Sequence, residues 1–139
     1  MTIAEIIARI TEECPEFAEV GHALTSPAIM AYPAAMVTPV RNQAKPPRIL
    51  MPGAYCQDVQ GIFGVYIVLE RRQNGALDQG AADDFDALTA SLRAALTNWN
   101  APGLTQPVIY TGGELAPYDA GIFTWRETFS AEFEISLIS

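Results

Sequence analysis

The chain has 139 residues, half of them hydrophobic, and a formal net charge of −8 at neutral pH. This length is that of one domain, which we place over residues 1–139, and the hydrophobic content excludes global disorder because it can supply a packed core. The acidic balance argues against a dedicated nucleic-acid-binding protein, because such proteins normally carry a basic face for the phosphates.

Cysteine usage and the N-terminal sequence bear on the cellular compartment. Cys14 and Cys56 are far apart in the sequence, so we expect free thiols in a reducing cytosol rather than a disulfide. The N-terminus lacks the basic segment of a secretory signal. The longest apolar run, residues 28–37, contains Pro33 and is too short for a bilayer, so we expect no membrane partner.

The first residues of the chain predict an amphipathic helix. Thr2 and Glu5 match a capping box, and isoleucines recur at helical spacing from residue 3 to residue 10. We expect about three turns that end before Pro15. A short extended piece should follow, with a turn at Gly21, and residues 23–30 form either a helical turn or a loop.

Residues 34–40 predict a strand at the edge of a sheet. Pro33 and Pro39 bracket this segment, and proline cannot serve an interior hydrogen-bond ladder. Residues 41–53 then predict an irregular loop, because three prolines and a glycine interrupt any regular pattern. We expect this loop to be disordered in the isolated protein and to become ordered on docking; the alternative is a solvated, mobile loop.

The same loop supplies candidate interface residues, because it holds three of the eight cations of the chain and no acid. Two further arginines follow the next strand, where they end an apolar run in water. The candidate interface residues are therefore Arg41, Lys45, Arg48, Arg71 and Arg72. Acidic surface on a partner would receive the loop cations.

The rest of the chain should be organised around residues 57–72, which predict the central strand of one sheet. From 62 to 69 every residue except Gly64 is apolar, and most are β-branched or aromatic. Because side chains alternate along a strand, both faces are apolar and need cover, from the chain itself or from a neighbouring subunit. Gly61 and Gly64 indicate ordinary twist, a bulge or a close backbone approach.

A second helix should follow a turn at residues 73–80. Asp83, Asp84 and Asp86 would lie in its first turn, where the helix dipole favours anions. Its apolar stripe has helical spacing and runs to Trp99. A short strand at 107–111 leads into two glycines.

The last strand, residues 122–137, is the longest and alternates apolar with polar side chains, as in a half-buried antiparallel strand. Glu127 is the one acid on the apolar face. We predict that Trp125 on this strand and Trp99 both pack between helix and sheet. The element order predicts an α/β (α+β) single domain with a mostly antiparallel or mixed sheet and two main helices packed on one face.

Few residues suggest chemistry. His22 is the only histidine, so a catalytic triad or a zinc site has little to use. The acids at 83–86 lack the pattern of a calcium loop. Glu127 is the odd acid among aromatic side chains, and pairing with Arg93 or Arg126 explains its position simply. We therefore expect no catalytic residue, no metal and no cofactor.

Several segments together resemble the tail terminator proteins of long-tailed bacteriophages and related tail-like particles. The resemblance covers most of the chain, and the last segment carries the most weight. Besides the N-terminal helix, the segments are PAAMVTPV with its proline-rich loop, FGVYIVLERR, DFDALTASLRAAL, and YTGGELAPYDAGIFTWRETFSAEFEI.

The resemblance implies a structural protein of the virion, assembled in the host cytoplasm. Members form small α/β domains in a hexameric ring on the head-proximal end of the tail tube, where the ring stops polymerisation. The implied partners are further copies of the chain, the major tail tube protein and a neck or head-completion protein. DNA would pass the lumen without specific binding. The loop at 41–53 would dock on a neighbouring subunit or on the tube.

Two alternatives remain open from the sequence. One is a head-closure or neck protein of the same particle, which differs in the partner that it binds. The other is a small soluble enzyme or ligand-binding module that uses Asp83, Asp84 or Glu127. A deep pocket lined by those residues in a monomer would favour the second alternative.

Overall fold

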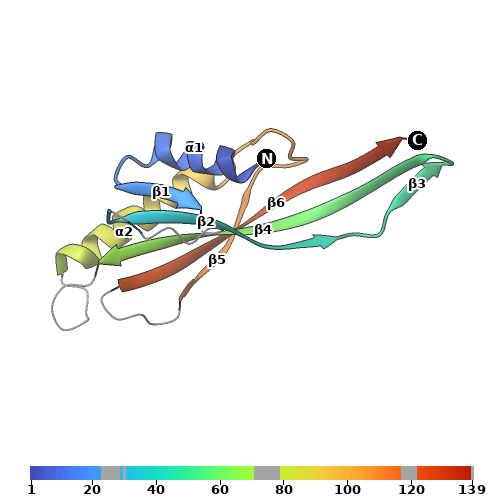
Figure 1. Cartoon of the computed structure of the whole chain (residues 1–139). Helices are drawn as coiled ribbons and strands as arrows, with labels where there is room; N and C mark the ends of the chain where they lie inside the picture. The colour runs from blue at the N-terminus through green and yellow to red at the C-terminus, as the bar shows by residue number, and fades with distance from the viewer. Residues whose placement is uncertain (23–28, 30, 71–78, 117–121, 139) are drawn as a thin grey trace.

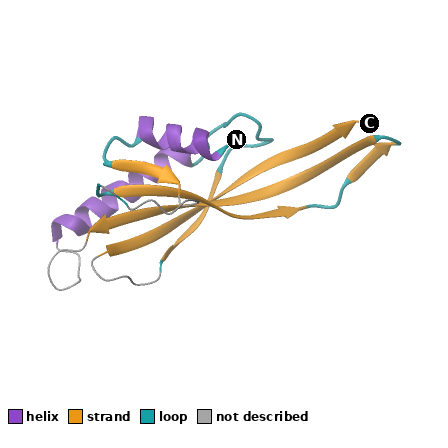
Figure 2. Ribbon diagram, viewed as in Figure 1, coloured by secondary structure: helices purple, strands orange, loops and turns teal. Residues whose placement is uncertain are grey.

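The computed structural model describes all residues except 23–28, 30, 71–78, 117–121 and 139. The described residues form two helices and six strands (Figures 1 and 2). In chain order these are α1 (Ile3–Glu13), β1 (Glu19–His22), β2 (Ala34–Ala44), β3 (Arg48–Met51), β4 (Ala54–Glu70), α2 (Gln79–Leu96), β5 (Ile109–Leu115) and β6 (Ile122–Ile138).

The strands form one mixed sheet with β4 at its centre, which confirms the predicted fold class and central strand. The strand order is β1-β2-β4-β6-β5, and β3 pairs with β4 beyond the end of β2. Only β1 and β2 run parallel; the other pairs are antiparallel. β4 and β6 pair along their whole length, from Ala54 opposite Ile138 to Glu70 opposite Ile122.

Both helices cover one face of the sheet, as predicted (Figure 1). Thr2 caps α1 by accepting a hydrogen bond from the backbone of Glu5, and Ile6 and Ile10 point inward. The apolar stripe of α2 meets the same core, which includes Phe63, Val65, Ile67, Leu88, Leu92, Leu96 and Phe129. Trp99 and Trp125 both pack against this core, as predicted, but each is only partly buried.

The opposite face of the central strand is covered by the chain itself. Val68 on this face packs with Ala34 and Met36, and Ile29 and Tyr32 lie against them. A neighbouring subunit is therefore not needed to cover β4 within the body of the domain.

Beyond the helices the sheet continues as a narrow projection, which extends to the right in Figure 1. We call this projection the arm; it comprises residues 41–60 and 132–138. The predicted irregular loop at 41–53 is wrong, because Arg41–Ala44 continue β2 and Arg48–Met51 form β3. The prolines lie in the connections on either side of β3, where no ladder bond is required.

The edge strand predicted for residues 34–40 is wrong for the first four of these residues and right for Pro39. β1 pairs with β2 only at Ala34–Val37, so this part of β2 is an interior strand. Pro39 lies beyond that pairing, and the register with β4 shifts between Pro39 and Arg41. The bulge therefore lies in β2 rather than in β4. A close backbone approach occurs at Gly61, where a Cβ would lie 3.2 Å from the carbonyl oxygen of Ala131, whereas at Gly64 the nearest atom is Cδ of the Arg126 side chain, at 3.3 Å.

Two further predictions need correction, and two others concern residues that the structure largely does not describe. The turn expected at Gly21 is wrong, because Gly21 lies inside β1 opposite Met36. α2 begins at Gln79, so Asp83 comes after its first turn and the helix dipole does not explain the acids there. The segments expected at 23–30 and 73–80 fall largely outside the described residues. Neither described helix is long and apolar enough to cross a membrane.

Candidate assembly interface

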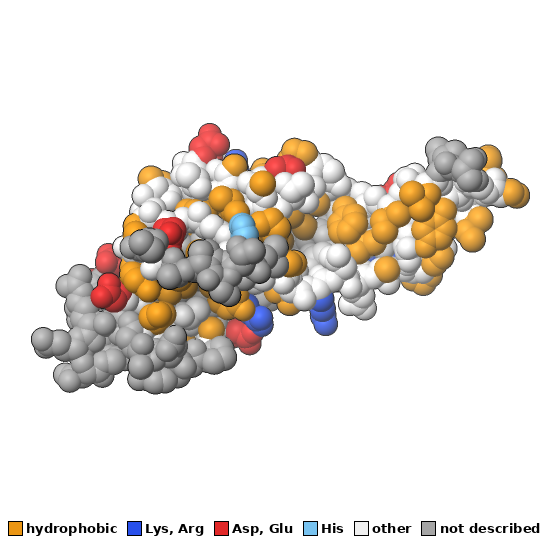
Figure 3. All heavy atoms as spheres, viewed as in Figure 1, with side chains coloured by type: hydrophobic (Ala, Val, Ile, Leu, Met, Phe, Trp, Pro, Cys, Tyr) orange, Lys and Arg blue, Asp and Glu red, His pale blue; other side chains and the backbone are white. Residues whose placement is uncertain are grey.

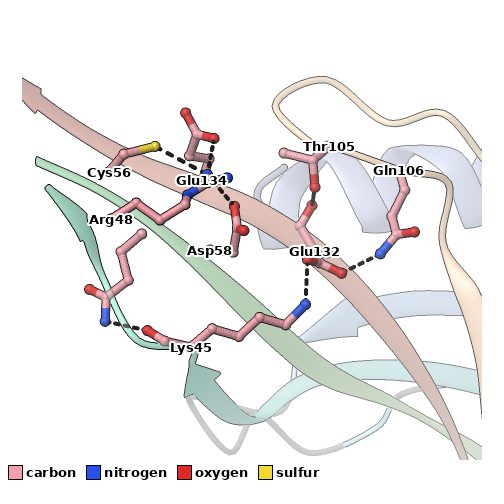
Figure 4. Close-up of polar contacts among 9 residues, drawn as sticks. Lys45, Arg48, Cys56, Asp58, Thr105, Gln106, Glu132 and Glu134 are labelled. Carbon is pink, nitrogen blue, oxygen red and sulfur yellow. Dashed lines mark hydrogen bonds and ion pairs between the residues drawn. The ribbon is translucent and has the colours of Figure 1, made fainter. Parts of the chain in front are cut away.

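The predicted interface cations Lys45 and Arg48 lie on the arm and pair with acids of the same arm (Figure 4). Nζ of Lys45 lies 3.0 Å from Oε1 of Glu132. A guanidinium nitrogen of Arg48 lies 3.3 Å from Asp58 and 3.1 Å from Glu134. Sequence reasoning assigned these cations to a partner's acids, whereas acids from β4 and β6 lie beside them.

The remaining candidate cations differ from these two. Arg41 is exposed at the start of the arm, and no ion pair joins it to another described residue. Arg71 and Arg72 lie outside the described residues. The structure therefore brings together Lys45 and Arg48 with their acids, and Arg41 stands apart from that network.

These ion pairs define one face of the arm, which we call the ionic face. Alternation places Cys56, Asp58, Glu132 and Glu134 on the same side of β4 and β6. Arg48 also donates a hydrogen bond to Sγ of Cys56 at 3.3 Å. That bond, followed by the charge of Asp58, raises the pKa of Arg48 above its ordinary value. The ion pairs of Arg48 join β3 to β4 and β6.

The other face of the arm is apolar. Register places Ile49, Tyr55 and Leu137 in one row across β3, β4 and β6. Ile135 lies next to this row, and Val59 opposite Phe133 continues the face to the body. Ile49 is 69% and Leu137 60% exposed, so the helices that cover this face in the body leave it open on the arm. Hydrophobic atoms gather there in Figure 3.

Sequence reasoning missed this apolar face because it needs the register of three strands. Ile49 was assigned to an irregular loop, although Ile49-Leu50-Met51 is an apolar triplet directly after two prolines and an arginine. The alternation of the last strand predicts β structure as far as Leu137, which agrees with β6. One feature of the sequence does indicate this face. The alternating strand is longer than the usual strand, so its apolar side extends beyond the part of the sheet that the two helices can cover.

A cavity of about 360 Å³ lies where the arm meets the body. The start of α1 lines one side with Ile3 and Ile6, Leu104 lines another, and Phe63 and Phe133 form its floor on the sheet. Its lining is mainly apolar, and it includes none of the residues Asp83, Asp84 and Glu127 that the enzyme alternative would use. The cavity therefore extends the apolar face of the arm toward α1.

Glu127, the acid among apolar side chains, is fully buried and paired with Arg93 of α2, one of the two partners suggested by the sequence. Its Oε1 lies 2.7 Å from Arg93 and also accepts a hydrogen bond from the indole of Trp125 at 2.9 Å. The hydrogen bond that Arg93 donates to Glu127 raises the pKa of Arg93. Burial raises the pKa of Tyr110, whose ring lies 5.0 Å from the guanidinium carbon of Arg93. The cluster joins α2, β5 and β6.

The structure does not bring the other candidate catalytic or metal-binding residues together into a site. Asp83, Asp84 and Asp86 are exposed on α2, and His22 ends β1. Among the residues that the structure describes, no group of three or more His, Cys, Asp and Glu side chains could hold a metal ion.

Comparison with known protein families assigns the chain to one of them. The model of a family described as phage tail terminator protein matches residues 1–138, essentially the whole chain. The comparison with curated proteins gave no match. This full-length match agrees with the resemblance seen in the sequence and with the α+β single domain. The chain therefore belongs to the phage tail terminator family, and it is a structural protein of the bacteriophage tail.

Proposed function

We propose that this protein forms a closed ring on the head-proximal end of the tail tube, stops tube polymerisation there and joins the tail to the neck of the head. The family supports the place in the tail. The observation that carries the ring is the arm, because its apolar face is left exposed by the chain that builds it. By resemblance to the family, the ring has six subunits.

A ring suits a subunit of this shape. Head-to-tail contacts between two different surfaces of one subunit close into a ring when the rotation closes, and otherwise grow into filaments. The formal charge of −8 would let DNA pass a lumen without binding to its wall. This function requires no catalytic residue, metal or cofactor.

Stoichiometry tests the ring directly. Native mass spectrometry of the full chain, alone and with the tube protein of the same particle, should give one closed oligomer, expected to be a hexamer. The same measurement with the portal-side neck protein separates a terminator from a head-closure protein, because a terminator must bind the tube protein. A chain that is monomeric under all three conditions would contradict the ring.

The ion pairs of the arm give a mutational prediction. Arg48→Glu should weaken assembly, because it places a third acid beside Asp58 and Glu134 and separates β3 from its neighbours. Added salt should restore part of the assembly, since the screening length falls from about 10 Å at 0.1 M to about 3 Å at 1 M salt. Sedimentation velocity at both salt concentrations measures the effect.

Arg41→Glu is the matched control, because it changes the charge of the same arm by the same amount without breaking a described ion pair. It should assemble nearly like the parent. If Arg41→Glu weakened assembly more than Arg48→Glu, the cations of the arm would act by docking on a partner's acids rather than by holding the arm in shape.

A further inference from the structure

The arm has two chemically different faces, and the difference indicates which one is covered. On the ionic face, Lys45 and Arg48 reach acids on neighbouring strands, as in a surface that faces water. On the opposite face, the row Ile49, Tyr55 and Leu137 exposes large apolar side chains at the far end of the arm. Exposed apolar patches with a polar surround indicate contact with another molecule.

The amide of Gln57, beside the exposed row on the apolar face, is already satisfied within the arm. Gln57 lies between Tyr55 and Val59 on β4, opposite Ile135. The hydroxyl of Tyr55 donates to Oε1 of Gln57 at 2.6 Å, and Nε2 of Gln57 donates to the backbone carbonyl of Lys45 at 2.8 Å. Covering this face would therefore leave neither the amide nor the phenol without a hydrogen-bond partner.

The charge of the arm points to a second copy of the same chain. The arm holds three cations and three acids, so its formal charge is zero and the whole net charge of −8 lies outside it. Two copies that met through their bodies would repel each other. The arm is the part of the molecule that can approach another copy without this repulsion.

The length of the arm is also suited to a neighbour. The seven residues 132–138 of β6 lie on the arm, and at about 3.3 Å per residue they span about 23 Å. A domain of this size has a radius of gyration of about 14 Å. The arm points away from the helices of its own chain (Figure 2). It is long enough to lie along an adjacent subunit in a ring.

We propose that the apolar face of the arm docks on a second copy of this chain, so that in the assembled ring each subunit's arm lies on its neighbour. The contact is head-to-tail, because the arm of one copy meets a different surface of the next. This inference rests on the proposed ring and names the surface that closes it.

Leu137→Glu tests the inference, with Leu115→Glu as the matched control. Leu137 is 60% exposed on the arm, and Leu115 is 61% exposed on β5 in the body. Both variants should keep the parent's circular dichroism spectrum, which shows that the subunit still folds. Leu137→Glu should raise the dissociation constant of self-association more than about tenfold, because the contact would strip water from a carboxylate, whereas Leu115→Glu should change it less than about threefold.

Ile49→Glu should repeat the effect of Leu137→Glu from a different strand of the same row, which excludes a local defect in β6 as the cause. Sedimentation equilibrium of the full chains measures all four dissociation constants. Equal effects at Leu137 and Leu115, no effect at Leu137 and Ile49, or a parent that stays monomeric would each overturn the inference.

Mixing tests the direction of the contact. A Leu137→Glu subunit keeps the surface that receives its neighbour's arm, so it should enter parent oligomers and give mixed masses in native mass spectrometry. Variant monomers beside unmixed parent oligomers would contradict a head-to-tail contact. If the Leu137→Glu ring stayed intact but no longer stopped tube growth, the arm would meet the tube, and the inference would fail while the proposed function stood.

Discussion

Replacing Arg93 with alanine should lower the free energy of unfolding by about 3–5 kcal/mol, because it leaves an unpaired charge in the core. Glu127 is 0% exposed, and Arg93 is the cation bonded to it, at 2.7 Å. The side chain of Arg93 is itself 43% exposed and can return to water, whereas the carboxylate cannot. Urea unfolding of purified protein measures the loss.

Two controls separate the unpaired charge from lost packing. Glu127→Gln removes the charge but keeps an acceptor for the indole of Trp125, so it should cost less than about 2 kcal/mol. The double variant Arg93→Ala with Glu127→Gln should recover most of the stability that Arg93→Ala loses. A double variant no more stable than Arg93→Ala would show that Arg93 acts through packing on Tyr110 instead.

Phe129→Ala should cost about 3–5 kcal/mol, because it opens a cavity at the centre of the core. Phe129 is fully buried on β6, with its ring centroid 5.4 Å from Phe63 and 5.5 Å from Tyr110. Since small domains have only about 5–15 kcal/mol in total, little soluble protein should remain at 37 °C. Thermal unfolding of the variant, or its soluble yield, measures the effect.

Ile109→Ala is the control for this cavity, because Ile109 is half exposed on β5, directly beside β6. It should cost less than about 1 kcal/mol. If the Phe129→Ala and Ile109→Ala variants had the same melting temperature, this result would contradict the position of Phe129 in the core.

Periodicity predicted the parts of this fold that are buried by their own chain. The alternation in β6, the two apolar faces of β4 and the helical spacing of α1 each needed one local pattern, and each was confirmed. The pair of Glu127 and Arg93 could be named as an option because an acid on an apolar face requires a cation.

The arm could not be predicted in this way because it depends on contacts between distant segments. Lys45 meets Glu132 across 87 positions of the sequence, and Arg48 meets Glu134 across 86. Prolines near β3 were interpreted as breakers of structure, although they lie at the ends of short strands that pair with β4. The start of α2 was missed for a related reason, since Gly80 in its first turn resembles the end of a turn.

Tube length is the measurement that tests the proposed function most directly. Tube protein of the same particle is polymerised with increasing amounts of this chain, and the lengths are measured by electron microscopy. We predict that tubes stop growing once one ring is present per tube, that this ring is visible at one end, and that Leu137→Glu leaves growth unchecked. Tubes that grow equally long with the parent chain in excess would contradict a terminator.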